Sequence, residues 1–120
     1  MPFTISTTRE FAAAHQLRLY DGSMEPLHGH NWRVRVTVAA EQLDAIGVVM
    51  DFHELEQIVD RIISGWHNRH LNEVPDFQQL NPSAENVAFK LGTLLKIPTA
   101  ARLKLVEVWE TATNQATYFP

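Results

Sequence analysis

Three histidines stand at positions whose spacing could bring their imidazole rings around one metal ion. His28 and His30 flank a glycine where an alternating, extended segment begins, and His15 ends the apolar run from Phe11 to Ala14. Side chains two residues apart on a strand project to the same face, so His28 and His30 would point together. An antiparallel neighbour carrying His15 would complete the set. Three protein nitrogens with an open fourth position are the ligand arrangement of a catalytic zinc ion.

The same histidines also have a purely structural interpretation. A buried histidine is more often a hydrogen-bonded core residue than a ligand, and a His-x-His pair can arise by chance in a loop. The spacing alone leaves both interpretations open. The deciding feature is whether the strand that ends at His15 pairs with the strand that carries His28 and His30.

Length and composition indicate an ordinary globular protein. The 120 residues fit a single domain spanning 1–120, which is long enough to bury a core without disulfide or metal staples. The net charge of −4, with basic residues interspersed among acids, provides no basic stripe for a phosphate backbone, so we expect no nucleic-acid partner. The absence of cysteine excludes disulfides, thiolate ligands and a cysteine base or nucleophile.

The first residues and the hydropathy of the chain indicate its cellular compartment. The N-terminus has no basic segment followed by an apolar stretch, and no apolar run approaches the ~20 residues that span a bilayer. We therefore expect a cytoplasmic protein without a membrane partner.

The elements that must position the histidines can be predicted from periodicity. Residues 3–15 and 30–40 alternate in the manner of half-buried strands, and the turn-forming residues between them form a loop too long for a tight hairpin. Such a loop, beside the histidines, is a natural place for site residues.

The second half of the chain is predicted to contain two helices and two more strands. Asp51 with Glu54 forms a capping box that opens a helix running to about Trp66, and a second helix restarts at 81–85 with Pro82 in its first turn. Residues 102–111 and 115–119 alternate as strands. The expected fold is α+β: a four-stranded antiparallel sheet in β-β-α-α-β-β order with both helices on one face. Exposed sheet edges favour a homo-oligomer.

Six short motifs match one known family in order and spacing. They are Phe11–His15, Leu27–Asn31, Gly47–Phe52, Leu71-Asn72, Asn81–Asn86 and Val108–Thr111. On these motifs, over nearly its full length, the chain resembles the 6-pyruvoyl-tetrahydropterin synthase family, which includes the 6-carboxytetrahydropterin synthases of bacterial queuosine biosynthesis. The resemblance implies the tunnelling fold (T-fold), in which subunits pair their sheets edge to edge, commonly as a homohexameric dimer of trimers with active sites between subunits.

The resemblance also implies the roles of individual residues. It implies a zinc ion held by His15, His28 and His30. It further implies that Glu110 grips the amino-pyrimidine edge of a pterin by accepting two parallel N–H donors, and it puts Ser83 near the pterin, with Glu85 following. From the sequence alone, Glu110 would be taken as a solvated charge on an edge strand, and the match of Trp109-Glu110-Thr111 to the family reverses that interpretation.

The chain departs from the family at the positions that move protons. Met24 stands where the ordinary member has a cysteine base, and a thioether neither gains nor loses a proton. His67 and Asn68 stand where the family has an Asp-His pair. A variant branch of the family lacks the cysteine, has a glutamate at the position of Glu25, and cleaves the side chain of dihydroneopterin to the hydroxymethyl pterin of folate synthesis.

Glu25 is therefore the candidate base. A carboxylate near zinc and partly desolvated could have its pKa raised enough for acid–base work, and His67, or His70 in its place, could supply the second group. Each residue also has a structural interpretation. Glu25 could face solvent in a loop, and the two histidines could complement the dipole at a helix C-terminus.

These observations lead to three hypotheses. The first is a zinc-dependent lyase that acts on the side chain of dihydroneopterin or its triphosphate, by retro-aldol cleavage with Glu25 in place of the cysteine. The second is a 6-carboxytetrahydropterin synthase-type enzyme with a rewired proton relay. The third is a non-catalytic, zinc-containing pterin-binding homologue that keeps Glu110 and the metal.

Overall fold

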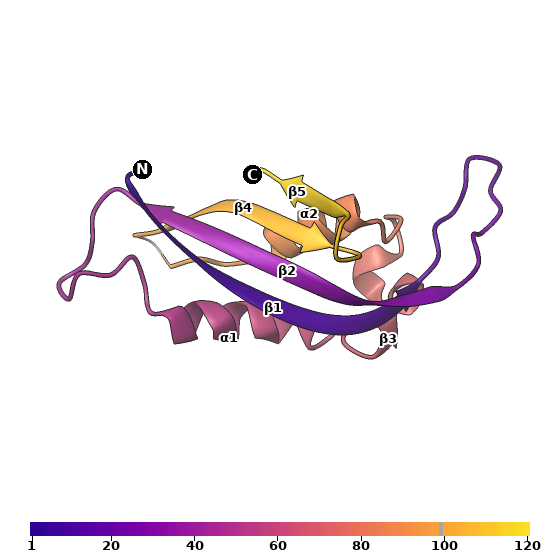
Figure 1. The fold of residues 1–120 in the computed structure, drawn as a ribbon, viewed down its shortest axis with the longest axis horizontal. Coiled ribbons are helices and arrows are strands. Elements are labelled where there is room, and N and C mark those ends of the chain that lie inside the picture. Colours follow the sequence, from indigo (N-terminus) through magenta and orange to yellow (C-terminus); the bar gives the residue numbers. More distant parts are fainter. Residues whose placement is uncertain (99) are drawn as a thin grey trace.

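The fold is built around two long, paired strands. The computed structural model describes residues 1–98 and 100–120. Strands β1 (Phe3–His15) and β2 (His28–Ala40), each of 13 residues, pair antiparallel along their whole length. Figure 1 shows both strands curving along the long axis of the molecule, with the loop between them projecting beyond the sheet.

Three further strands complete the sheet. Strand β4 (Arg102–Trp109) pairs antiparallel with β2, and β5 (Gln115–Tyr118) pairs antiparallel with β4. On the other side, the two-residue strand β3 (Arg69–His70) runs parallel to β1. The order across the sheet is β3-β1-β2-β4-β5.

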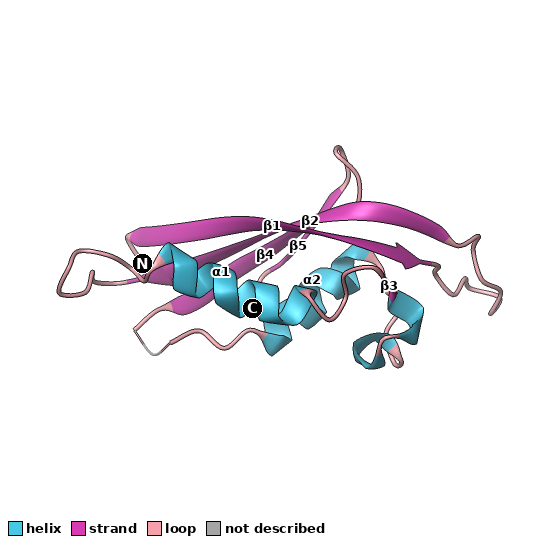
Figure 2. Ribbon diagram, turned by 90° about the horizontal axis from the view of Figure 1, so that it is seen from below, coloured by secondary structure: helices cyan, strands magenta, loops and turns pink. Residues whose placement is uncertain are grey.

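Both helices lie on the same face of this sheet, as Figure 2 shows. Helix α1 spans Phe52–Ile63 and helix α2 spans Ala84–Leu94. Two short 3-10 turns, η1 (Leu71–Glu73) and η2 (Pro75–Phe77), lie between them in the chain. Among the described residues, no helix is long and apolar enough to cross a membrane.

The core lies between the sheet and the helices because alternate strand residues turn their apolar side chains toward the helical layer. The buried side chains include Trp32, Val34 and Val36 from β2, Leu55 and Val59 from α1, and Val87 and Leu91 from α2. The uncovered face of the sheet carries charged side chains. There the guanidinium of Arg35 donates to both carboxylate oxygens of Glu107, at 2.6 and 2.9 Å.

The predicted α+β class and the placement of both helices on one face are confirmed, but the strand count is corrected from four to five. The additional strand, β3, has only two residues and pairs with Ala13 and Ala14. A two-residue strand carries no periodicity, so a sequence pattern does not predict it.

The helix boundaries also differ from the expected ones. Helix α1 ends at Ile63 rather than near Trp66, and α2 begins at Ala84, so Pro82 precedes that helix instead of standing in its first turn. The caps explain the starts. Asp51 accepts from the N–H of His53, and the Ser83 hydroxyl accepts from the N–H of Asn86.

Candidate metal centre and active site

The pairing of β1 with β2 brings the three histidines together. His15 lies directly opposite His28 in the ladder, and His30 lies opposite Ala13, on the same face. Glu110 directly follows β4, the other neighbour of β2. One ligand atom from each of these four residues lies within 4.8 Å of all the others. The pairing that the sequence left open is therefore present, and the four side chains form a group that could hold a metal ion.

Hydrogen bonds to backbone carbonyls fix the orientation of two of the imidazole rings. Nδ1 of His15 lies 2.7 Å from the carbonyl oxygen of Pro82, and Nδ1 of His28 lies 2.8 Å from that of Pro26. A carbonyl only accepts hydrogen bonds, so each Nδ1 carries the proton and donates it. In the neutral rings, Nε2 therefore keeps a free lone pair, which is the state that metal-ligating histidines adopt.

The burial of these nitrogens also fits a metal. Nε2 of His15 and of His30 is buried and has no hydrogen-bond partner among the described residues. Oε1 of Glu110 lies 2.9 and 3.0 Å from these two atoms, but not in hydrogen-bond geometry. Buried polar atoms normally find a partner, so unpartnered lone pairs that converge on one point call for a ligand. The donor set suits a divalent ion of the kind that imidazole binds.

The electrostatics of His30 favour its neutral form. Burial lowers the pKa of His30 from its ordinary value, and the neighbouring rings of His15 and His28 act in the same direction, while the Glu110 carboxylate opposes them. A lowered pKa keeps the Nε2 lone pair free of a proton over a wider pH range. That state is the one required of a metal ligand.

Glu25 lies at the edge of this centre. Its Oε1 is 3.9 Å from Nε2 of His28 and accepts the N–H of Leu17 at 3.0 Å. The side chain is only 26% exposed, so Glu25 is not the solvent-facing loop residue of the structural interpretation. Its neighbour Met24 is exposed.

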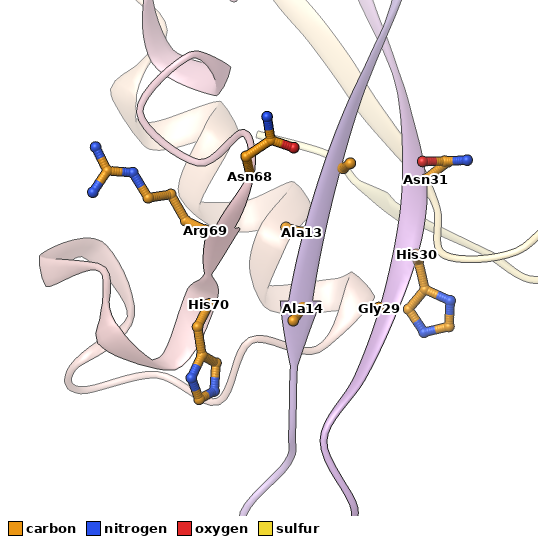
Figure 3. A pocket seen from close by; sticks show the side chains of 9 residues that line it. Ala13, Ala14, Gly29, His30, Asn31, Asn68, Arg69 and His70 are labelled. Atoms are coloured by element: carbon orange, nitrogen blue, oxygen red, sulfur yellow. The ribbon is translucent and has the colours of Figure 1, made fainter.

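His67 and His70 are not brought into the cluster of this chain. His67 is exposed, and its Nδ1 accepts the N–H of Ala12 at 3.1 Å. Nδ1 of His70 lies 3.3 Å from Oε1 of Glu73, and its Nε2 is buried without a partner. His70 and His30 both line an open cavity of about 560 Å³, in which Figure 3 shows them on opposite sides of β1.

The residues expected near a pterin differ in where they lie. Glu110 lies among the histidine nitrogens, where its carboxylate is within reach of a ligand at the centre. Ser83 uses its hydroxyl to cap α2, and Glu85 is exposed in the first turn of that helix, where a negative charge suits the helix dipole. Neither side chain belongs to the cluster of histidines and Glu110.

The structure also reveals contributors that sequence reasoning missed. The backbone carbonyls of Pro26 and Pro82 orient two rings, and a carbonyl leaves no signature in a sequence. The side chains of Asn72 and Asn81 hold the segment that follows His15. Both asparagines stand in motifs that match the family, and this is the signal that could have singled them out.

Comparisons with known proteins agree with this geometry. A family model described as 6-pyruvoyl tetrahydropterin synthase matches residues 4–120. The 6-carboxy-5,6,7,8-tetrahydropterin synthase of Synechocystis is 35% identical over 113 residues, which cover 91% of this chain and 87% of that protein. The dihydroneopterin monophosphate aldolase of Pyrococcus furiosus is 33% identical over 102 residues, which cover 83% and 82%.

A solved structure agrees as well. The 6-pyruvoyl tetrahydropterin synthase of Caenorhabditis elegans superposes with a TM-score of 0.83 at 26% identity, covering 98% of this chain and 95% of that one. The expected T-fold is thereby confirmed, and the named relatives are enzymes that process pterins. The family match extends over nearly the whole chain, and the chain belongs to the 6-pyruvoyl tetrahydropterin synthase family.

Proposed function

We propose that the protein is a zinc-dependent lyase of the aldolase type, which cleaves the side chain of dihydroneopterin or of one of its phosphate esters. The observation that carries the proposal is the Glu25 carboxylate, held 3.9 Å from Nε2 of His28 in a chain that has no cysteine. The likeness to the Pyrococcus furiosus dihydroneopterin monophosphate aldolase supports the same reaction class.

The binding roles follow from the donor set. Nε2 atoms of His15, His28 and His30 would hold the zinc ion, which supplies Lewis-acid polarisation of the substrate's side-chain hydroxyls when it is bound. Glu110 accepts two parallel N–H donors from the amino-pyrimidine edge of the pterin. Its side chain is 28% exposed, so it remains accessible to a bound ring. In this proposal, Ser83 and Glu85 contact the substrate from the start of α2.

The proton movements are assigned to the chain's own residues. Glu25 removes the proton from the hydroxyl on the second side-chain carbon, and that carbon becomes an aldehyde as its bond to the first side-chain carbon breaks. The electron pair passes into the C6–N5 double bond of the dihydropterin ring. A proton returned to the first side-chain carbon then gives 6-hydroxymethyl-7,8-dihydropterin and a two-carbon aldehyde, without net gain or loss of a proton.

His67 is proposed as the second proton-handling group. Its Nδ1 accepts the N–H of Ala12, so a neutral ring carries its proton on the exposed Nε2 and can donate it. Because His67 lies outside the cluster of its own chain, we propose a homo-oligomer, a dimer of trimers, in which His67 of the partner subunit completes each site. His70, whose Nε2 lacks a partner, is the substitute.

The test is turnover by purified, zinc-loaded protein. It is incubated separately with 7,8-dihydroneopterin, its monophosphate and its triphosphate, and the pterin products are separated by chromatography. We expect 6-hydroxymethyl-7,8-dihydropterin from at least one substrate, and no product from the Glu25→Ala variant at unchanged zinc content. Products that keep the whole side-chain carbon skeleton would refute the aldolase assignment.

The same experiment tests a second candidate, a 6-carboxytetrahydropterin synthase with a rewired proton relay. The 35% identity to the Synechocystis enzyme over 91% of this chain favours that candidate. It predicts 6-carboxytetrahydropterin from the triphosphate and no cleavage of dihydroneopterin. Pterin binding without turnover of any substrate would instead identify a non-catalytic homologue.

A further inference from the structure

The segment that follows His15 is held by two asparagine side chains that take the place of a neighbouring strand. Asn72 accepts the N–H of Gln16 at 3.0 Å and donates to the carbonyl of Gln16 at 2.7 Å. Asn81 does the same for Arg18, accepting its N–H at 2.8 Å and donating to its carbonyl at 3.0 Å. A primary amide offers the same donor and acceptor as a backbone peptide group, so each side chain reproduces one rung of a β-ladder.

The two asparagines also lie in line with the edge of the sheet. Strand β3 pairs with Ala13 and Ala14 of β1. Further along the same edge, Asn72 bonds to the backbone of Gln16 and Asn81 bonds to the backbone of Arg18. The extended edge runs past the end of β1 into the projecting loop of Figure 1, where β1 and β2 no longer pair. The asparagine side chains therefore order a segment that would otherwise expose its backbone to water.

The opposite edge of the same segment holds the proposed base. In an extended segment, alternate residues direct their backbone groups to opposite edges, so Leu17 faces away from both asparagines. Leu17 donates its N–H to Oε1 of Glu25 at 3.0 Å and accepts the N–H of Glu25 at 3.0 Å. The position of the Glu25 carboxylate beside His28 therefore depends on where the Leu17 peptide lies.

Both asparagines are tied to the rigid part of the fold. Asn72 follows Leu71, which is fully buried, and Asn81 precedes Pro82, whose carbonyl accepts from Nδ1 of His15 at 2.7 Å. The carbonyl of Asn81 accepts in turn from the side chain of Asn86 in α2, at 2.9 Å. The Asn81-Pro82 dipeptide therefore makes two contacts. The Asn81 side chain holds the segment whose Leu17 peptide bonds to Glu25, and the Pro82 carbonyl orients the ring of His15.

We propose that Asn72 and Asn81 are positioning residues, which hold the Leu17 peptide so that Glu25 stays at the metal centre in the geometry that proton transfer requires. The inference rests on the catalytic role proposed for Glu25 and adds the residues that enforce it. Misplacing a catalytic group by about 1 Å can cost about 100-fold in rate, so such residues affect turnover although they touch no substrate.

The sharpest variant is Asn81→Asp, because aspartate keeps the size and the acceptor of asparagine but loses the donor. Its second oxygen would face the carbonyl of Arg18, and two acceptors repel each other. Asn72→Asp places an acceptor against the carbonyl of Gln16 in the same way, and it replaces Asn81→Asp in the experiment if that variant folds poorly. Asp44→Ala is the matched control, since it removes two side-chain-to-backbone hydrogen bonds, to Ile46 and Val48, in the loop after β2.

The experiment is a double-mutant cycle with Glu25→Asp, which keeps a carboxylate and residual turnover, on the zinc-loaded protein, with kcat, KM and bound zinc measured for each variant. We expect Asn81→Asp to lower kcat by about 10- to 100-fold with KM and zinc content unchanged. We expect no further loss in the Glu25→Asp background, where the shortened side chain no longer bonds to the Leu17 peptide. The Asp44→Ala control keeps its kcat. An equal loss in both backgrounds, or a loss of zinc, would show that Asn81 acts on the fold or the metal and would overturn the inference.

Amide hydrogen exchange of Leu17 separates this inference from the proposed function. We expect the Leu17 amide to exchange faster in Asn81→Asp, and also in Glu25→Ala, than in the unmodified protein, at an unchanged thermal midpoint. If Glu25→Ala retains full activity, the proposed function fails, and the Leu17 exchange still reports whether the asparagines hold this peptide. Unchanged Leu17 exchange in both asparagine variants would refute the positioning role.

Discussion

The carboxylate of Glu25 lies 3.9 Å from Nε2 of His28. Glu25 belongs to the loop that joins β1 and β2, the paired strands that supply all three candidate imidazole ligands. This relationship puts an ionisable group beside the candidate metal centre in a chain that has no cysteine. It also places the proposed base on the loop side of the centre, whereas Glu110 approaches from the end of β4. Two carboxylates on different elements can therefore serve different roles.

Metal binding is expected to depend on the three histidines and on no other histidine. His15→Ala, His28→Ala or His30→Ala should each abolish stoichiometric zinc, measured by elemental analysis after dialysis. Zinc at 100 times its Kd should stabilise the native protein by about 2.7 kcal/mol, seen as a higher thermal midpoint, because the ion binds only the folded chain. His53→Ala is the control, since this exposed ring pairs with Glu56 and lies outside the cluster of histidines and Glu110. Retention of zinc by the His15 variant would refute the ligand set.

The stability of the metal-free protein should fall as the pH is lowered. Burial lowers the pKa of His30 below its ordinary value of 6.5, so between the two values the unfolded chain binds more protons than the native one. Unfolding is therefore favoured as the pH drops through about 6.5 toward the lowered pKa, and it is insensitive to this group above 6.5. Urea unfolding over this range, with His30→Gln as the comparison, should show a shallower dependence in the variant. A steeper dependence in the variant would contradict the assignment.

Glu110 is expected to serve the substrate more than the metal. Glu110→Gln keeps the shape of the side chain but replaces one acceptor with a donor, so it can no longer accept both N–H groups of the pterin edge. Hydrogen bonds to charged groups contribute about 1.5–3 kcal/mol, so pterin affinity should fall about 10- to 100-fold, while zinc stays at one ion per chain. Titration calorimetry with a pterin and elemental analysis measure the two quantities. Loss of zinc with unchanged pterin affinity would make Glu110 a fourth ligand instead.

Close packing of α2 against β5 should make Gly92 intolerant of a side chain. A Cβ at this position would lie 2.6 and 2.7 Å from two ring carbons of Tyr118. Overpacking of this kind costs about 1–3 kcal/mol, although alanine is the better helix former by about 1 kcal/mol. Gly92→Ala should therefore lower the free energy of unfolding in urea. Gly65→Ala, whose nearest contact is a carbonyl at 3.4 Å, provides the comparison. An equal or higher stability for Gly92→Ala would contradict the packing.

Much of this architecture could be predicted from the sequence because it repeats regularly. The alternation in residues 3–15 and 30–40 predicts the two long strands, and the spacing of His28 and His30 predicts their shared face. The two-residue strand β3 could not be predicted, since its pairing with β1 depends on where the chain returns after α1. Tertiary packing, rather than local pattern, sets that return.

The ionisable side chains of the candidate site could be predicted from the sequence, but the backbone and amide groups that orient them could not. The imidazoles and carboxylates of His15, His30, Glu25 and Glu110 are chemically distinctive, and the cluster contains three of these four. The carbonyl of Pro82 and the amide of Asn81 act through position alone. Residue type alone does not reveal such a role, although Asn81 lies in a motif that matches the family. The role proposed for His67 requires a second subunit, and residue patterns in one chain do not specify how two subunits would pack.

Glu25 is proposed to enable cleavage of the bond between the first and second side-chain carbons. Nuclear magnetic resonance tests this role on zinc-loaded protein turning over dihydroneopterin, or its monophosphate, labelled with carbon-13 at the second side-chain carbon. We expect the label to leave the pterin as a two-carbon aldehyde, in equal amount to 6-hydroxymethyl-7,8-dihydropterin, and Glu25→Gln to stop this release without loss of zinc. A label that stays attached to the pterin, or release that continues in Glu25→Gln, would refute the role of Glu25.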